Sequence, residues 1–476
     1  MEFLFFALLN GAAAAAAALV VRRFRLDAGG SAAGFLAGTV VFCFQVVISS
    51  VVLGHFGKLF LFNLLAAQLI LLFVIAAYVL YTEGDRPGGA AREERKTGTG
   101  NAAFSRWLYL FFPAAAGFAG LGLLFVYCAI SPPPPTDAFL YHLVFPAEWL
   151  KSGRISIVQT LSTDQASSYY PANAELLYLW LMAPFHDDVA ARFLQWFFAV
   201  VMMVCGWGIV RRAGLGKTAS AAAAAATLLT PGFFRQVVNC DADIVFTAFF
   251  LLAVYFLLVA GDEGGWHGFA LGGLAAGLMA GTKSIGVLYC VLLLPLVVVA
   301  VVRAKREGRG AFSGLATLWI VCVFAAGGYW YLRNFHATGS PFYPLGLSVG
   351  GFTVFPGAYG REAMLGTYLH VDVRSFGTLF EILREHVLGV PLLISAVVVA
   401  SAGLVARLAN RGGVNEWEDR NRFTFFYLVC LPFLAALLFW FVNPYNTHNN
   451  YRFLLPVVFF FNLLILCAFR KGGAGG

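Results

Sequence analysis

The chain has 476 residues, of which 60% are apolar and only 12% are charged, whereas a soluble domain carries about 25% charged residues. Its 48 phenylalanines and ten tryptophans fall largely within long apolar runs, and a run of about 20 apolar residues spans a bilayer as a helix. These numbers exclude a water-soluble fold and indicate a multi-span membrane protein. The net charge of +8 then reflects the Lys and Arg that orient the spans, and we expect no nucleic-acid partner.

Apolar runs separated by charged or Gly/Pro-rich breaks predict an all-α integral membrane protein with about thirteen transmembrane helices. The first run is followed, not preceded, by arginines, which is typical of an anchor with its amino terminus outside and not of a cleaved signal peptide. The predicted spans lie near residues 3–20, 31–53, 59–81, 107–129, 189–210, 218–232, 243–260, 267–281, 284–302, 312–332, 388–407, 423–442 and 453–469.

The charges of the connecting segments favour one orientation of these spans. With the amino terminus outside, 21 Lys and Arg fall on the cytoplasmic side and 11 on the other, which accounts for all 32. The positive-inside rule supports this assignment. We therefore expect a cytoplasmic carboxyl terminus, two long outer loops at 130–188 and 333–387, and a functional site on the extracytoplasmic face of the cytoplasmic (inner) or cell membrane.

A charged, glycine-containing segment at 82–106 predicts a solvated cytoplasmic linker. It divides the chain into a three-helix membrane extension with its linker, residues 1–106, and a main multi-span domain, residues 107–476. The sequence assigns no function to the extension.

Several kinds of chemistry gain no support from the sequence. The eight cysteines are scattered without a CxxC pair and lie mostly in apolar runs, so they indicate small core residues and not disulfides or metal ligands. No motif for nucleotide hydrolysis, zinc proteolysis, serine hydrolysis or EF-hand calcium binding is present.

The first outer loop opens with four prolines at 132–135, followed by Thr136 and Asp137. The prolines predict a stiff, extended segment, and Thr136 or Asp137 can cap the helix that follows. Beyond them, apolar and polar positions fall on separate helical stripes, which is the pattern of a helix lying in the membrane interface. A second such helix is expected from Ala172 to about Phe185. The two helices would hold Asp137 at the mouth of the bundle.

The order of motifs in this loop and beyond it is similar to that of a known family. An acidic residue opens the loop, a Tyr-His pair follows, and an aromatic-Pro-x-x-x-Glu-Leu stretch comes later. In this respect the chain resembles the polytopic GT-C superfamily of lipid-linked glycosyltransferases, close to the protein O-mannosyltransferase and aminoarabinose transferase group. The resemblance covers roughly residues 107–470 and rests on Asp137, Tyr141, His142, Trp149, Leu150, Gly153, Tyr170, Pro171, Glu175, Leu176, Asp243, Gly281–Lys283, Tyr329–Asn334, Gly339–Pro344 and Tyr451–Pro456.

The resemblance implies that a sugar moves, with inversion, from a polyprenyl phosphate to a glycan, lipid or protein acceptor on the extracytoplasmic face, among membrane lipids. Such a displacement needs a base for the acceptor proton and cations for the leaving phosphate. Asp137 suits the role of general base, and His142 could orient it or share its proton. The alternatives are that Asp137 only caps its helix and that His142 makes a structural hydrogen bond.

Lys283, Arg333 and Arg452 each lie at the predicted outer end of a span, where the phosphate of a lipid donor would sit. Arg presents a bidentate fork to phosphate oxygens and Lys presents a point charge. The alternative is that these side chains only snorkel to the membrane surface.

A further set of polar residues on the outer side could contact the sugar or the acceptor. Each also has a plainer interpretation as a solvated loop acid or a polar turn between spans. The set comprises Tyr141, Asp164, Glu175, Asp241, Asp243 and Asn449.

The first-loop motif departs from the family in one respect that concerns metal binding. Many members carry a second carboxylate beside the first, whereas Asp137 is followed by Ala138 and Phe139. The motif therefore gives no support to a divalent metal, which stays possible, and we expect no other cofactor.

The main alternative function is a multi-span transporter or flippase of lipid-linked sugars. Transporters tend to have two related halves and ionisable residues at mid-membrane. Here the charges gather at one face and no halves match, which favours the transferase. A polymerase or ligase of lipid-linked glycans shares the substrate class and differs mainly in its acceptor.

Overall fold

The computed structural model describes residues 1–82 except 28, and 104–358 except 134–136, 161–165, 213–216, 229 and 309–311. It also describes residue 377 and parts of 424–435 and 451–460. The predicted span 388–407, most of the two spans after it and most of the linker at 82–106 lie outside the described residues.

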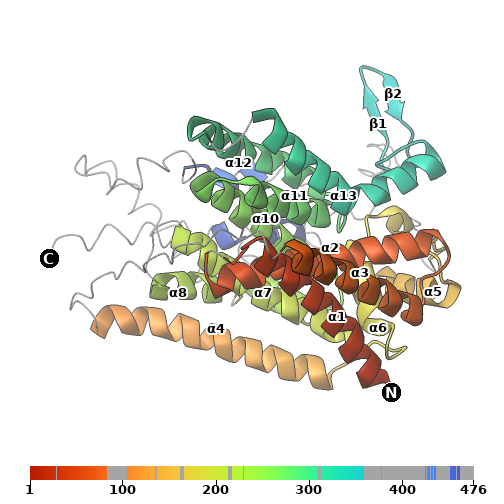
Figure 1. Cartoon of the computed structure of the whole chain (residues 1–476), viewed down its shortest axis with the longest axis horizontal. Coiled ribbons are helices and arrows are strands. Elements are labelled where there is room, and N and C mark those ends of the chain that lie inside the picture. Colours follow the sequence, from red (N-terminus) through yellow and green to blue (C-terminus); the bar gives the residue numbers. More distant parts are fainter. Residues whose placement is uncertain are drawn as a thin grey trace.

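Within the described part of the chain nearly every element is a helix, and seven helices are long and apolar enough to cross a membrane. This confirms the predicted fold class of an all-α integral membrane protein. The seven are α1 (Glu2–Arg23), α2 (Ser31–His55), α3 (Leu61–Thr82), α7 (Leu194–Arg212), α10 (Asp243–Glu263), α12 (Gly286–Arg306) and α13 (Phe312–Thr338). A further long helix, α4 (Phe104–Ile130), runs along one flank of the bundle (Figure 1).

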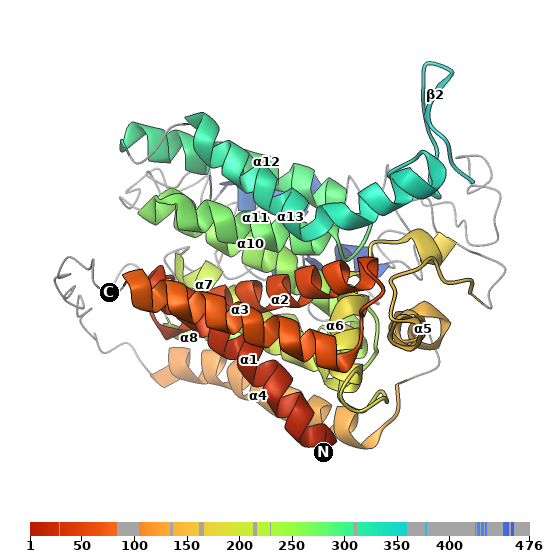
Figure 2. The same cartoon turned by 45° about the vertical axis from the view of Figure 1, so that its right-hand side comes forward.

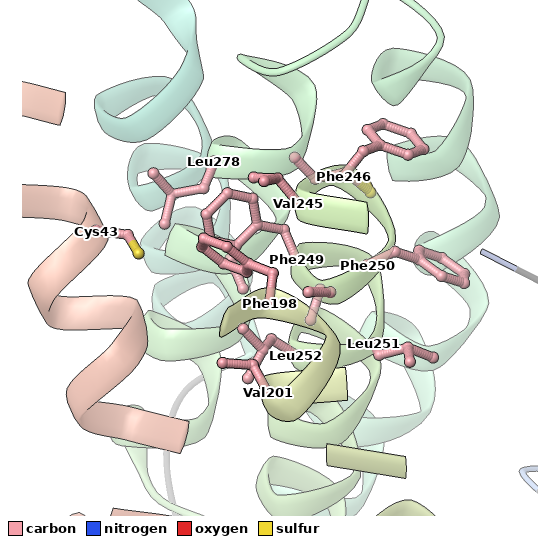
Figure 3. Close-up of a cluster of buried hydrophobic side chains, with 14 of the residues drawn as sticks. Cys43, Phe198, Val201, Val245, Phe246, Phe249, Phe250, Leu251, Leu252 and Leu278 are labelled. Carbon is pink, nitrogen blue, oxygen red and sulfur yellow. The ribbon is translucent and has the colours of Figure 1, made fainter. Parts of the chain in front are cut away.

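Helix α10 lies at the centre of the bundle (Figure 1). In its most apolar stretch, 94% of the residues are buried inside the protein. A helix that is buried on every side must be apolar on every side. Figure 3 shows α10 side chains packed with Phe198 of α7 and with Leu278 of α11 (Trp266–Ala280). The rings of Phe198 and Phe249 meet edge to face at 5.2 Å. This packing fixes the first residue of α10, Asp243, in space.

The described helices bring two groups of charged residues to opposite ends of the bundle. At the carboxyl-terminal end of α10, Asp262 accepts a hydrogen bond from Arg212 of α7 at 3.0 Å. Arg303 of α12 lies 3.8 Å from the same carboxylate. The other end of α10 begins with Asp243, and we call it the site end.

The first three helices pack against the remainder of the bundle. Trp180 donates a hydrogen bond to Asn10 of α1 at 3.1 Å, and Cys43 of α2 belongs to the buried cluster drawn in Figure 3. The division of the chain at residue 106 stays a prediction, but α1–α3 contribute to the core that supports the site.

One predicted span is replaced by two shorter helices. The sequence predicts a span over 218–232, whereas the structure has α8 (Lys217–Leu228) and α9 (Pro231–Val237). Proline is tolerated in the first turn of a helix but not in its interior, so Pro231 starts a new helix. With 12 residues, α8 is about 18 Å long, which is shorter than the roughly 30 Å hydrocarbon core.

The predicted loop helices form, with two corrections. The first is broken into a π-helical turn, η2 (Ala138–His142), and α5 (Val144–Ser152), and the Asp137 side chain makes no capping hydrogen bond to it. The second, α6 (Asn173–Met182), is buried inside the protein along nearly its whole length and presents no exposed polar face. Its polar residues find partners inside the protein, which allows the whole helix to be enclosed.

A β-hairpin projects from the site end beyond α13 (Figures 1 and 2). Strand β1 (Leu347–Val349) pairs antiparallel with β2 (Phe352–Phe355). Gly350 and Gly351 join them with φ values of +57° and +85°, a conformation that favours glycine and suits a tight two-residue turn.

Candidate functional site

Asp137 stands directly before η2 and is held by two side chains from different parts of the chain. Tyr141, one turn later, donates a hydrogen bond to its Oδ2 at 3.1 Å. Arg452 donates to the same oxygen at 2.6 Å, although 315 residues separate the two in sequence. The carboxylate is therefore an ion-pair partner and not a helix cap.

Arg452 lies among three carboxylates. Besides Asp137, its Nη1 atom lies 3.5 Å from Oδ2 of Asp241 and 3.8 Å from Oδ2 of Asp243. Both aspartates are 2% exposed. Burying a carboxylate is costly unless a cation compensates it, so the guanidinium is the group that allows these acids to lie close together.

Lys283 completes what we call the charged cluster: Asp137, Asp241, Asp243, Lys283 and Arg452. Its Nζ lies 2.5 Å from Oδ1 of Asp243 and 5.3 Å from the centre of the Phe453 ring. The lysine lies in a short connection between α11 and α12, with only 14% of its side chain exposed. It faces the cluster, which is not how a snorkelling lysine behaves.

A buried histidine and glutamate lie beside the charged cluster. Nδ1 of His142 and Oε1 of Glu175 are 2.5 Å apart, and each side chain is only 4% exposed. A carboxylate in this position fixes the tautomer and the orientation of the imidazole ring. The structure thus pairs two residues that the sequence placed on separate loop helices.

Burial and the neighbouring charges act in opposite directions on the pKa values of two of the three acids beside Arg452. Burial is the largest single influence on Asp137 and disfavours its charged form. The Arg452 guanidinium, with His142 and Tyr141, outweighs burial and holds the pKa of Asp137 below its usual value. For Asp241 burial dominates and raises the pKa.

The turn that carries Asp241 and Asp243 is held by residues that the sequence analysis did not single out. Oε1 of Gln195 accepts the backbone N–H groups of Ile244 at 3.1 Å and Val245 at 3.2 Å. Its Nε2 and the Tyr178 hydroxyl both donate to the carbonyl of Asp241. The sequence feature that could have identified Gln195 is its position inside an apolar span, where a polar residue usually has a role.

Asn173 performs a similar task for the connection that carries Lys283. Its backbone N–H donates to the Gly281 carbonyl at 2.7 Å, and its Nδ2 donates to the Ala326 carbonyl of α13 at 3.0 Å. Trp330 of α13 donates to its Oδ1 at 2.8 Å. A side chain at Gly281 would collide with this amide.

The remaining predicted site residues lie elsewhere. Arg333 donates to the Ser168 carbonyl at 3.1 Å and to Asn334 at 3.0 Å, and its guanidinium lies over the Trp330 ring. Among its described contacts none is with the charged cluster, and its binding of the donor phosphate stays a prediction. Asp164 and Asn449 lie outside the described residues.

One group of residues at the site has the composition and spacing of a metal site. Asp137, His142 and Asp241 each offer one ligand atom, and these atoms lie within 4.8 Å of one another. The site as a whole therefore offers a carboxylate at the mouth of the bundle, two cations that can take an anion, and a set of metal-ligand atoms.

Comparison with known proteins gives a partial sequence match and a fold. The family described as dolichyl-phosphate-mannose-protein mannosyltransferase matches residues 177–330. The fold is similar to the crystal structure of ArnT from Cupriavidus metallidurans bound to undecaprenyl phosphate, with a TM-score of 0.52 and 13% sequence identity. The similarity covers 78% of this chain and 61% of that one. No curated protein matches the chain by sequence.

The fold and the site define a polytopic membrane protein with a charged cluster at one end of an apolar helical bundle. The matched family covers α7, α10, α11 and α12, which carry or support that cluster. Over these residues the chain is similar to that mannosyltransferase family, and its fold is similar to that of the ArnT structure, which agrees with the resemblance that its sequence motifs predicted.

Proposed function

We propose that the protein is a glycosyltransferase that moves a sugar from a polyprenyl phosphate to a glycan, lipid or protein acceptor on the extracytoplasmic face of the membrane. The observation that carries the proposal is the charged cluster. In it, the loop carboxylate of Asp137 contacts Arg452, and Arg452 and Lys283 both lie beside Asp243. The fold is shared with an ArnT structure that is bound to undecaprenyl phosphate, which supports a donor of this chemical class.

Asp137 is the general base in this proposal. The acceptor hydroxyl loses its proton to the Asp137 carboxylate while its oxygen forms a bond to the anomeric carbon of the sugar. The bond from that carbon to the phosphate oxygen breaks, and the electron pair leaves with the polyprenyl phosphate. A single displacement of this kind inverts the anomeric carbon, and base catalysis typically contributes about 10²–10⁴-fold in rate.

Arg452 and Lys283 hold the leaving phosphate. Both are paired with carboxylates in this structure, Arg452 with Asp137 at 2.6 Å and Lys283 with Asp243 at 2.5 Å. The phosphodiester of the bound donor carries one negative charge and gains a second as its bond to the sugar breaks. It competes with the carboxylates for the same donors through charge-assisted hydrogen bonds. When it takes the guanidinium, Oδ2 of Asp137 is released for the acceptor proton.

The test is the rate of sugar transfer by the purified protein in liposomes, measured with a panel of polyprenyl-phosphate sugars. We expect Asp137→Asn to lower the rate of an active donor by about 10²–10⁴-fold. Asp187→Asn is the matched control, because Asp187 is exposed and accepts its hydrogen bond from Val189 through an oxygen that Asn retains. Transfer by Asp137→Asn at the wild-type rate would show that Asp137 is not the base.

A further inference from the structure

The three-helix extension meets the first outer loop at a turn. Residues 54–60, where α2 ends and α3 begins, lie against residues 153–155, which follow α5. The N–H of Leu59 donates a hydrogen bond to the Gly153 carbonyl at 2.9 Å, and the N–H of Ile155 donates to the Gly54 carbonyl at 3.3 Å. We call residues 54–60 the outer turn.

We propose that the outer turn positions the first outer loop, and with it Asp137, against Arg452 and the turn that carries Asp241. The extension is then part of the catalytic unit, although it precedes the family match at 177–330. The effect on the rate of transfer rests on the proposed function, whereas the positioning of the loop does not.

The contact between the outer turn and the loop leaves no room for added atoms. A Cβ on Gly54 would lie 2.5 Å from Cγ1 of Ile155. Gly153 ends α5 with a φ of +68°, and a Cβ there would collide with the ring of Phe60. Leu59 is fully buried. Segments packed this closely fix each other's position, because a well-packed interior transmits strain instead of absorbing it.

Residues 138–152 connect this contact to the site. They form η2 and α5, which follow one another almost without a break, with Asp137 directly before them and Gly153 directly after. Trp149 of α5 donates a hydrogen bond to the Ser156 carbonyl at 2.9 Å, which ties the segment after the helix back to the helix. Because a helical stretch moves largely as a unit, a shift at Gly153 is passed to Asp137.

The bundle holds the same loop from a second place. The rings of Trp149 and Trp330 of α13 stack with their centres 5.9 Å apart and their planes at 24°. Trp149 is 1% exposed. The loop is therefore positioned by α13 and by the outer turn together.

The extension also supports the partner of His142. Trp180 of α6 donates a hydrogen bond to Asn10 of α1 at 3.1 Å. The same helix α6 carries Glu175, whose Oε1 lies 2.5 Å from Nδ1 of His142. Both members of this buried pair thus stand on elements that contact α1–α3.

The proposed reaction is sensitive to the position of the loop. Asp137 has to reach the acceptor proton over a hydrogen-bond distance, and a displacement of about 1 Å can cost about 10²-fold in rate. Lys283 and Arg452 lie on other segments of the chain, so the donor phosphate should still bind when the loop shifts. The outer turn should therefore affect kcat and not KM for the donor.

The test is sugar transfer by the full-length protein in liposomes with a substitution at the outer turn. Gly54→Ala places a methyl group against Ile155, and we expect kcat to fall about 10–10²-fold with little change in KM for the donor. Gly38→Ala is the matched control, because it makes the same change in the same helix and its Cβ would meet only Val21, at 3.9 Å. It should keep the wild-type kcat.

A second substitution separates positioning from a general loss of stability. Ile155→Ala removes the atoms that the new methyl group would meet. In the Ile155→Ala background, Gly54→Ala should therefore change kcat by less than about twofold, since a double-mutant cycle isolates the effect of a direct contact. Phe60→Ala adds no atom and removes the ring beside Gly153, and it should lower kcat in the same direction as Gly54→Ala.

Hydrogen exchange measures the positioning without sugar or lipid. The amides of residues 138–152 should exchange faster in Gly54→Ala than in the wild type or Gly38→Ala, because a weakened contact makes local opening easier. Unchanged exchange, a wild-type kcat in Gly54→Ala, or an equal loss of kcat in the Ile155→Ala background would overturn the proposal. If the wild type transfers no sugar from any donor, the proposed function fails and hydrogen exchange alone decides the positioning.

Discussion

Arg452 is the side chain on which the proposed donor site depends most. Its two terminal nitrogens face different carboxylates, Nη2 toward Asp137 and Nη1 toward Asp241 and Asp243. Lysine keeps the charge but loses this planar fork. We predict that Arg452→Lys weakens binding of a polyprenyl phosphate about ten- to hundredfold, since a charge-assisted hydrogen bond contributes about 1.5–3 kcal/mol and 1.4 kcal/mol is tenfold.

Binding of a fluorescent polyprenyl phosphate to the wild type, Arg452→Lys and Lys283→Ala measures this effect. Arg306→Lys is the control, because it makes the same change at an exposed residue of the opposite end. Thermal stability should stay close to that of the wild type in Arg452→Lys. Equal affinity in all of these proteins would favour the transporter over the transferase.

Gln195 is expected to matter for stability and for the geometry of Asp241. Its Oε1 accepts from the N–H groups of Ile244 and Val245 in the first turn of α10, which have no partner within their own helix. Gln195→Leu has a similar volume but leaves both groups unpaired, at a cost of about 1–3 kcal/mol each.

The measurement for Gln195→Leu is the thermal midpoint in detergent together with donor-lipid affinity. Both should fall, because the turn that faces Arg452 loses its support. An unchanged midpoint and an unchanged affinity would mean that Tyr178 alone holds the Asp241 carbonyl in place.

The chemical types at the site could be predicted from the sequence, but their pairing could not. Asp137 was found because it opens the first outer loop, and Lys283 and Arg452 because they stand at predicted ends of spans. Nothing local indicates that Arg452 contacts Asp137 across 315 residues, or that Arg333 holds the Ser168 carbonyl instead of joining them. Such pairings depend on how helices pack, and packing is a property of the whole bundle.

Helices α11 and α13 approach each other closely through glycines. A side chain at Gly273 would place its Cβ 2.6 Å from the Trp319 carbonyl, and one at Gly277 would meet the backbone at Val323. Glycines four residues apart allow the backbones of membrane helices to come into contact. This contact matters for the site because α13 holds Asn173 and, through it, the connection to Lys283.

We predict that Gly273→Ala lowers the thermal stability of the protein, because rigid backbone has to move. Gly314→Ala on α13 is the control: it is exposed, and an added Cβ there meets no atom within 4 Å. That substitution should be neutral or slightly stabilising, since alanine favours a helix over glycine by roughly 0.5–1 kcal/mol. Equal effects of the two substitutions would contradict the close contact.

The elements that could be predicted are those whose sequence has a single interpretation. Helix α10 is apolar over its whole length, and its predicted span of 243–260 closely matches Asp243–Glu263. Helix α6 was predicted as a second interfacial helix with the same pattern as the first, and the burial of its polar residues was not predicted. In the structure they face partners such as Trp330 and His142, which no periodicity can reveal.

The molecule separates its charges into two ends. The opposite end joins Arg212, Asp262 and Arg303 in a compact set of ion pairs. At the site end, buried carboxylate oxygens and a histidine nitrogen have no hydrogen-bond partner among the described residues. A set of charges that only anchors helices has no need of unpaired atoms. This difference is why we place the function at the end where Asp137 lies.

The orientation of the whole molecule in the membrane can be tested with two matched substitutions. Lys151 at the site end has an 80% exposed side chain, and Lys305 near the end of α12 is exposed at the opposite end. An impermeant thiol reagent added to intact cells should label Lys151→Cys, and it should label Lys305→Cys only after the cells are permeabilised. The unsubstituted chain corrects for the native cysteines. The reverse pattern would place the site on the cytoplasmic face and would refute transfer on the outer side. It would also put the end that carries the 21 Lys and Arg outside, against the positive-inside rule.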